Sequence, residues 1–253
     1  MSRSLLAGAL VLASAACSPV GATLQTGYTQ MRVGGSFALA DGTGGTGDAP
    51  LQDVGAAFGL GDDRGSPYVR AQLDLGGLVL GADAFLFEER GEGVLDASFG
   101  GLPATTPVAA DLRFGCAKLS AVYDIDLGLV KVAPGLAMDV FDLDFRVEET
   151  SLGNAEEIDE LVGVPLLFVR AEAGIGVVDL VGEIGYLETP RIDGAEGRFL
   201  DVEVLAECSV LPMLHLFGGY RLIDLDANGD TGSESYGIDL QVRGWVLGGG
   251  LRF

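Results

Sequence analysis

A period of two in hydrophobicity runs through most of this chain, and it restricts the fold more than any other feature does. In the stretch "FLDVEVLAECSV", apolar and polar side chains alternate, as they do when successive side chains of a β-strand point to opposite faces. One face would carry Leu200, Val202, Val204, Ala206, Cys208 and Val210, and the other Asp201, Glu203, Glu207 and Ser209. The same alternation recurs over 69–75, 169–175 and 236–243, and more weakly over 29–40, 78–88, 110–126, 129–147, 180–188 and 214–222. The pattern predicts about ten strands, with eight as the alternative.

The connections between these strands alternate in length. Short connections are expected at Gly76-Gly77 and near 126–128, 177–179 and 211–213, whereas long, acidic, glycine-rich connections are expected at 41–66, 89–108, 148–163, 189–197 and 224–236. Such alternation is typical of an antiparallel meander with tight turns at one end and long loops at the other. The sequence therefore predicts an all-β, up-and-down barrel over residues 27–253.

Alternation alone does not say which solvent the apolar face meets. A soluble exported barrel that binds an apolar ligand would bury that face, and a transmembrane barrel would expose it to lipid. The polar faces carry charges of both signs, which suits an ion-paired lumen, and the strands reach the ~9–11 residues that cross a bilayer. The chain also combines a net charge of -22 with a mean hydropathy of +0.37. These observations favour a transmembrane β-barrel.

An ion-paired lumen would draw on the charged residues of the polar faces. The acids expected inside are Asp74, Asp83, Asp139, Glu172, Glu183, Asp201, Glu203 and Glu207, and the bases are Arg32, Arg70, Arg113, Lys131, Arg170, Arg221 and Arg243. A barrel of eight to ten strands has room mainly for its own side chains, so paired charges are expected to close the lumen. The excess of acids leaves a narrow, cation-preferring channel as the alternative.

The first seventeen residues have the composition of a secretory signal peptide. Arg3 precedes a short apolar run that ends in small residues. Cleavage after the "ASA" of Ala13–Ala15 is one possibility; the other is lipidation of Cys17, because "SAAC" resembles a bacterial lipobox. Residues 18–26 would form an N-terminal segment ahead of the barrel.

The last strand, "GWVLGGGLRF", places Trp245, Leu247, Leu251 and Phe253 on one face. In these features the chain resembles the small β-barrel proteins of the Gram-negative outer membrane, the OmpA/OmpX-like barrels, in architecture only. The resemblance implies a monomer in the outer membrane, surrounded by lipid and lipopolysaccharide. It also implies recognition of Phe253 by the barrel-assembly machinery.

One conflict remains in this last strand. Ile238, Leu240 and Val242 lie at even positions, whereas Trp245 and Phe253 lie at odd ones. Both sets can face lipid only if a β-bulge between Arg243 and Gly250 shifts the alternation by one residue.

Two stretches carry candidate chemistry. "DLDANGD" supplies Asp224, Asp226, Asn228 and Asp230, whose spacing matches the opening of a calcium-binding loop. The match then fails, because Ser235 stands where a bidentate Glu is needed. An acidic hairpin loop, with weak Ca²⁺ binding as the alternative, is expected there, and no other cofactor.

His215 is the only histidine, and it is expected inside the barrel near a tight turn. The His-x-Ser pair of barrel lipid deacylases is absent, because His215-Leu216-Phe217 stands in its place. The expected role is therefore structural or one of surface interaction without enzymatic activity, with a lipid-modifying enzyme as an alternative. Nucleic acid is not an expected partner, because the chain has only two lysines.

Overall fold

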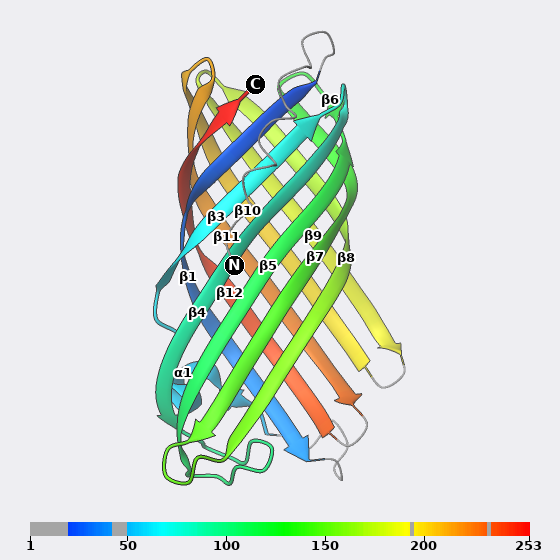
Figure 1. The fold of residues 1–253 in the computed structure, drawn as a ribbon. Coiled ribbons are helices and arrows are strands. Elements are labelled where there is room, and N and C mark those ends of the chain that lie inside the picture. The colour runs from blue at the N-terminus through cyan, green and yellow to red at the C-terminus, as the bar shows by residue number, and fades with distance from the viewer. Residues whose placement is uncertain (1–19, 42–49, 193–194, 232–233) are drawn as a thin grey trace, which may run out of the picture.

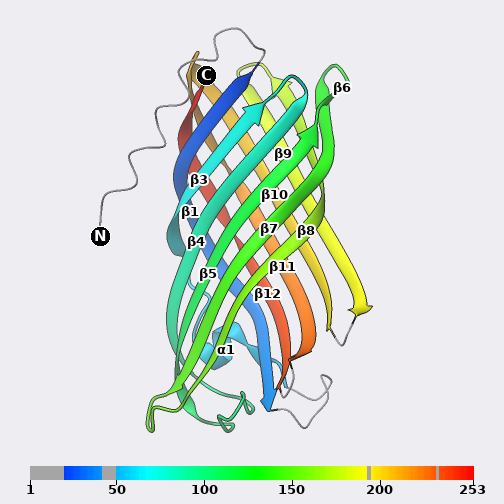
Figure 2. The same ribbon diagram turned by 45° about the vertical axis from the view of Figure 1, so that its right-hand side comes forward.

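The computed structural model describes residues 20–41, 50–192, 195–231 and 234–253, which form a closed antiparallel β-barrel (Figures 1 and 2). The predicted signal peptide and Cys17 lie outside the described residues. Ten long strands build the wall: β1 (Gly21–Asp41), β3 (Arg64–Asp74), β4 (Leu78–Val94), β5 (Pro107–Tyr123), β7 (Val130–Glu149), β8 (Ala155–Ile175), β9 (Val178–Ile192), β10 (Ala195–Leu211), β11 (Leu214–Thr231) and β12 (Glu234–Arg252). The prediction of an all-β barrel with about ten strands is confirmed.

Each wall strand pairs with its neighbours in sequence order, and β12 pairs with β1 from Thr23↔Arg252 to Asp41↔Glu234. The backbone of Ala22 and Phe253 exchanges two hydrogen bonds at the end of this seam. The barrel therefore begins at Gly21, ahead of the boundary at residue 27 that the sequence suggested. In the described part of the chain, no helix is long and apolar enough to cross a membrane.

The two ends of the barrel differ, and they are named here by what they carry. At the turn end, all four predicted short connections are present, for example between β3 and β4 and between β8 and β9. At the helix end lie the short strand β2 (Gln52–Asp53) and α1 (Val54–Phe58), while the short strand β6 (Ile125–Asp126) lies at the turn end (Figure 1). The long loops expected at 148–163, 189–197 and 224–236 are wrong, because β7 to β12 continue through most of these residues.

The polarity of the wall reverses along each strand, as β5 shows. In its helix-end half, Asp111 and Arg113 point outward while Leu112 and Phe114 are buried inside. In its turn-end half, Leu119 points outward and Lys118 is buried inside. The turn half therefore has an apolar exterior and a polar interior, and the helix half has the opposite arrangement.

The apolar exterior of the turn half forms a continuous belt. Its exposed members include Leu24, Val69, Leu80, Leu119, Leu136, Leu167, Ile184, Val204, Leu216 and Leu247. The rim of the belt toward the helix end is aromatic, with Tyr28, Tyr186, Tyr220 and Trp245 partly exposed. On β12 the belt runs from Trp245 to Phe253, which at ~3.4 Å per residue and a tilt of about 40° gives a height of about 20 Å. A belt of this height edged by aromatic side chains matches the hydrocarbon core of an outer membrane.

The helix half is packed like the interior of a soluble protein. Phe145 has no exposed surface and stacks on Phe37 with ring centroids 4.6 Å apart. Phe58 of α1 meets the edge of Phe145 at 5.0 Å, and the Asp53 carboxylate caps the helix by accepting hydrogen bonds from the backbone N–H groups of Gly55 and Ala56. This half rises beyond the belt with a packed aromatic interior and a polar exterior.

The predicted β-bulge in the last strand is wrong. The pairing of β12 with both β1 and β11 runs without a register shift from Arg243 to Gly250. Trp245 and Phe253 point outward as expected, but Ile238, Leu240 and Val242 are buried inside the barrel. No bulge is needed because the wall changes polarity at this level, so a single strand can bury its apolar side chains in one half and expose them in the other.

Candidate functional site

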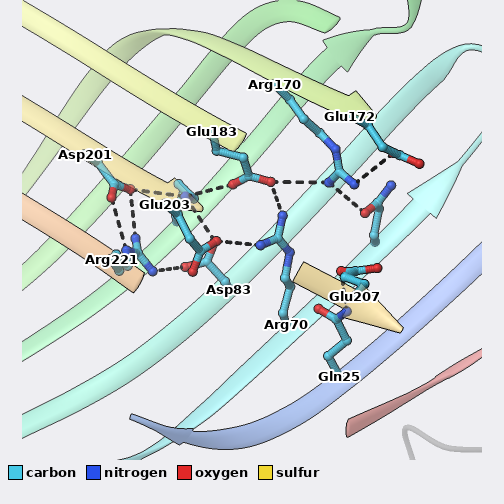
Figure 3. Close-up of polar contacts among 12 residues, drawn as sticks. Gln25, Arg70, Asp83, Arg170, Glu172, Glu183, Asp201, Glu203, Glu207 and Arg221 are labelled. Carbon is cyan, nitrogen blue, oxygen red and sulfur yellow. Dashed lines mark hydrogen bonds and ion pairs between the residues drawn. The ribbon is translucent and has the colours of Figure 1, made fainter. Parts of the chain in front are cut away.

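A network of buried charges fills the lumen of the turn half (Figure 3). Arg221 of β11 has no exposed surface. Its guanidinium donates to Asp83 of β4 at 2.5 Å and to both carboxylate oxygens of Asp201 of β10 at 3.1 and 2.9 Å. The same group lies 5.2 Å from the centre of the Phe85 ring. Arg221 thus joins two strands that lie on different sides of the barrel.

Lys118 of β5 is the second cation of this interior network. Its Nζ lies 3.4 Å from Asp83, 3.2 Å from Glu183 and 3.1 Å from Asp201. All four side chains are nearly inaccessible to water. Since Arg221 contacts two of the same carboxylates, the two cations hold Asp83 and Asp201 from both sides.

Arg70 of β3 carries the network across the lumen. It pairs with Glu183 of β9, and with Glu203 of β10 at 2.5 Å. The hydroxyl of Tyr68 also donates to Glu203, at 3.2 Å. Strands β3 and β9 are far apart in the order of the wall, so these contacts cross the lumen at this level.

Arg170 of β8 extends the network toward the turn end. It donates to Glu183 at 3.3 Å, to Glu172 at 3.5 Å and to the amide oxygen of Gln72 at 2.8 Å. The interior network therefore draws side chains from seven of the ten wall strands. Its members are Arg70, Asp83, Lys118, Arg170, Glu183, Asp201, Glu203 and Arg221.

Asp139 of β7 stands beside this network without joining it. Its side chain is fully buried, and neither carboxylate oxygen has a hydrogen-bond partner among the described residues. Its cross-strand neighbour on β5 is Lys118, whose ammonium group contacts other carboxylates instead. Asp139 is therefore a buried carboxyl group outside the hydrogen-bonded network.

A smaller cluster lies at the turn end of the lumen. The side-chain amide of Gln25 donates to Glu207 at 2.7 Å and lies 2.8 Å from Nε2 of His215. Arg252 lies 3.3 Å from Glu207. His215 is buried in the lumen near a tight turn, as predicted. Within the described residues, Gln25 is the only hydrogen-bond partner of its ring, so no nucleophile is bonded to it.

The sequence identified most, but not all, of these interior residues. Asp83, Asp139, Glu183, Asp201, Glu203 and Glu207 are buried inside as predicted, and so are Arg70, Arg170 and Arg221. Three predictions are wrong, because Arg32, Arg113 and Arg243 point outward in the helix half, where the exterior is polar. Lys131 is exposed at the turn end. Lys118 is not among the predicted bases, although its alternation with Ala117 and Leu119 offers the same signal.

The predicted calcium-binding residues lie on β11 rather than in a loop. Asp224 and Asp226 point outward and lie 3.7 and 3.9 Å from Arg198, and Asn228 follows on the same face. The side chain of Asp230 lies outside the described part. Register adds Asp239 of β12, which is paired with Asp226. In the described ranges, no group of three or more His, Cys, Asp or Glu side chains is arranged to hold a metal ion.

Comparisons with known proteins bear on the fold. No protein-family model matches the chain, and no curated protein matches it. Among solved structures, the outer membrane protease OmpT from Escherichia coli matches with a TM-score of 0.56 at 10% identity, covering 92% of this chain and 96% of that one. Ail of Yersinia pestis, the attachment invasion locus protein, matches with a TM-score of 0.40 at 11% identity over 92% and 99%. The outer membrane protein AlkL matches with a TM-score of 0.39 at 14% identity, covering 93% of this chain and 91% of that one.

The match to the fold of OmpT, together with the belt, defines the fold class. The chain has the fold of the small bacterial outer-membrane β-barrels, and its turn half is the part built to contact lipid. At such low identity the comparisons extend to the fold alone, so the role of the protein has to be argued from its own side chains.

Proposed function

We propose that the protein is a non-conducting outer-membrane barrel whose extracellular half serves as a rigid platform for contacts at the cell surface. The observation that carries this proposal is the interior network, in which Arg70 of β3 reaches Glu183 of β9 and Glu203 of β10 across the lumen. In barrels of this class the short turns face the periplasm. The helix half, with α1, would accordingly face outward.

The acidic character of the chain suits such a surface. With a net charge of -22, the exposed helix half would contact anionic lipopolysaccharide through bridging divalent cations. The outward residues of the last strand, including Phe253, would be available to the barrel-assembly machinery. The first and last strands pair along their whole length, so the junction between β1 and β12 is closed, which is consistent with a monomer.

Single-channel recording in planar bilayers tests the closed lumen. The wild-type protein should show no conductance steps, since an ion would have to displace paired charges from a site that water scarcely reaches. A variant that shortens two crossing side chains, Arg70→Ala with Glu203→Ala, should also stay closed, because Lys118 still reaches Glu183 and Asp201 across the lumen. Discrete steps in the wild-type protein would instead favour the narrow cation channel.

The lipid-modifying enzyme is the alternative that His215 leaves open, because Ser209 is its cross-strand partner. Altered lipid A in cells that overexpress the protein, lost in His215→Ala and retained in Gln25→Ala, would favour the enzyme. Unaltered lipid A is expected if His215 is structural.

A further inference from the structure

The barrel wall is split between β8 and β9 in the helix half. Strand β8 stays paired with β7 as far as Glu148↔Ala155. It pairs with β9 only from Leu167↔Tyr186 to Ile175↔Val178. In both views the two strands separate toward the helix end (Figures 1 and 2). Residues 155–166 of β8 therefore form one edge of a lateral opening.

The exposure of side chains on β8 changes at this opening. Val164 and Leu166 point inward and are buried, as they are in a closed wall. Glu160 and Val162 occupy the same inward positions, yet both are exposed. The interior of the barrel can thus be reached from the side at this level.

Behind the opening lies a cavity of about 560 Å³. Its walls are mainly apolar and come from opposite sides of the barrel: Leu39, Phe114, Phe141, Leu143, Val164 and Ile238. Its rim on β8 is acidic, with Glu157, Asp159 and Glu160. This volume falls within the range of about 300–1,000 Å³ that is usual for small-molecule pockets.

Described residues obstruct part of the other routes into the cavity. The interior network crosses the lumen on the side of the turn end. Toward the helix end, Phe58 of α1 and Phe99 pack against Phe145 and cover part of the mouth. The split ends, on the side of the turn end, at Leu167 and Tyr186, which lie at the rim of the lipid-facing belt. In the orientation proposed above, on which this inference rests, a molecule in the outer leaflet would meet the opening at the membrane surface.

From this geometry we infer that the cavity binds the apolar chain of a single-chain amphiphile with a cationic head group, taken up sideways from the membrane. The apolar walls would hold the chain, and the carboxylates of the rim would lie beside the head group. Addition of a peptide strand to β8 is disfavoured, because Pro165 and the acidic residues of this edge are features that block such pairing.

Photocrosslinking tests the inference with the full chain in phosphatidylcholine nanodiscs. The probe is a dodecylammonium ion with a diazirine at the end of its chain, and a dodecyl sulfate with the same diazirine serves as the charge control. Mass spectrometry should find adducts of the ammonium probe in residues 158–164, 225–227 and 236–238, with excess unlabelled dodecylammonium suppressing them. Adducts confined to belt residues such as Leu119 and Leu136 would overturn the inference.

Two cavity-filling variants, Val164→Trp on β8 and Ala227→Phe on β11, place bulky side chains in the cavity from different strands. Each should lower interior labelling at least fivefold. Heat-modifiable gel mobility shows which of them folds. The inference fails if a folded variant is labelled as strongly as the wild type. Protection of amides 157–164 from hydrogen exchange that grows with protein concentration would likewise overturn it, in favour of strand addition by a second copy.

The rim is tested by the triple variant Glu157→Gln, Asp159→Asn, Glu160→Gln. Loss of three exposed charges should reduce labelling by the ammonium probe roughly 3- to 10-fold at low salt. The matched control Glu88→Gln, Asp111→Asn, Glu148→Gln removes the same charge from the outer wall and should leave labelling unchanged. Equal labelling by the ammonium and sulfate probes would refute the charge preference.

Discussion

Arg221 offers the sharpest test of the interior network, because its removal leaves two buried carboxylates short of a partner. In Arg221→Met, the side chain keeps its bulk but Asp83 and Asp201 lose three hydrogen bonds. Breaking a buried ion pair from one side costs about 3–5 kcal/mol. Lys118 still contacts both carboxylates, so a loss near the lower limit, about 3 kcal/mol, is expected in the free energy of unfolding.

The pairwise part of this loss can be isolated with a double-mutant cycle. Asp201→Asn alone should also destabilise the barrel, and the double variant should cost less than the sum of the two by about 1–3 kcal/mol. The assay is equilibrium unfolding in urea, with folded and unfolded barrel separated by their gel mobility. Additivity within about 0.5 kcal/mol would refute the idea that these side chains act as one network.

Three further outcomes are expected. Burial, followed by the nearby charges of Asp226 and Asp224, raises the pKa of Asp239 above its ordinary value. The folded state therefore loses stability as pH rises through that pKa. Asp239→Asn should be more stable than wild type at neutral pH and equal to it below about pH 3, where the carboxyl is protonated in both the folded and the unfolded state. Phe145→Ala should cost about 3–5 kcal/mol in the same unfolding assay, because it empties the centre of the aromatic core, whereas Leu136→Ala on the belt should cost much less. Weak Ca²⁺ binding at Asp224 and Asp226 stays the alternative to no binding, and calorimetric titration decides between the two. No heat is expected, whereas heat that Asp226→Asn abolishes would favour the alternative.

The barrel itself could be predicted from the sequence because alternation is a local property. Lengths of the period-two stretches and the short turns, such as Gly76-Gly77, determine the number and direction of the strands. Most interior charges followed from the same pattern, since Asp201 and Glu203 alternate with apolar residues through the whole turn half of β10.

The reversal of polarity could not be read in the same way. Alternation looks identical whether the apolar face points into the barrel or out of it. The pattern therefore predicts Ile238 and Leu240 on the lipid face, although they line the core. The outward acids and glycines of the helix half have the composition of loops, which is why 224–236 was expected to be a loop. Contacts across the lumen, such as Arg70 with Glu183, depend on the closure of the barrel and have no local signal in the sequence.

The central claim is that only the turn half of the wall contacts lipid. A single fluorophore attached at position 119 or 113 of β5, in a background without Cys17, Cys116 and Cys208, tests it on one strand. Both positions point outward, and about 15 Å of barrel height separates them. Brominated lipids should quench the fluorophore at position 119 strongly and the one at position 113 weakly, with the reverse order for an aqueous quencher. Equal quenching by brominated lipids at the two positions would contradict the account.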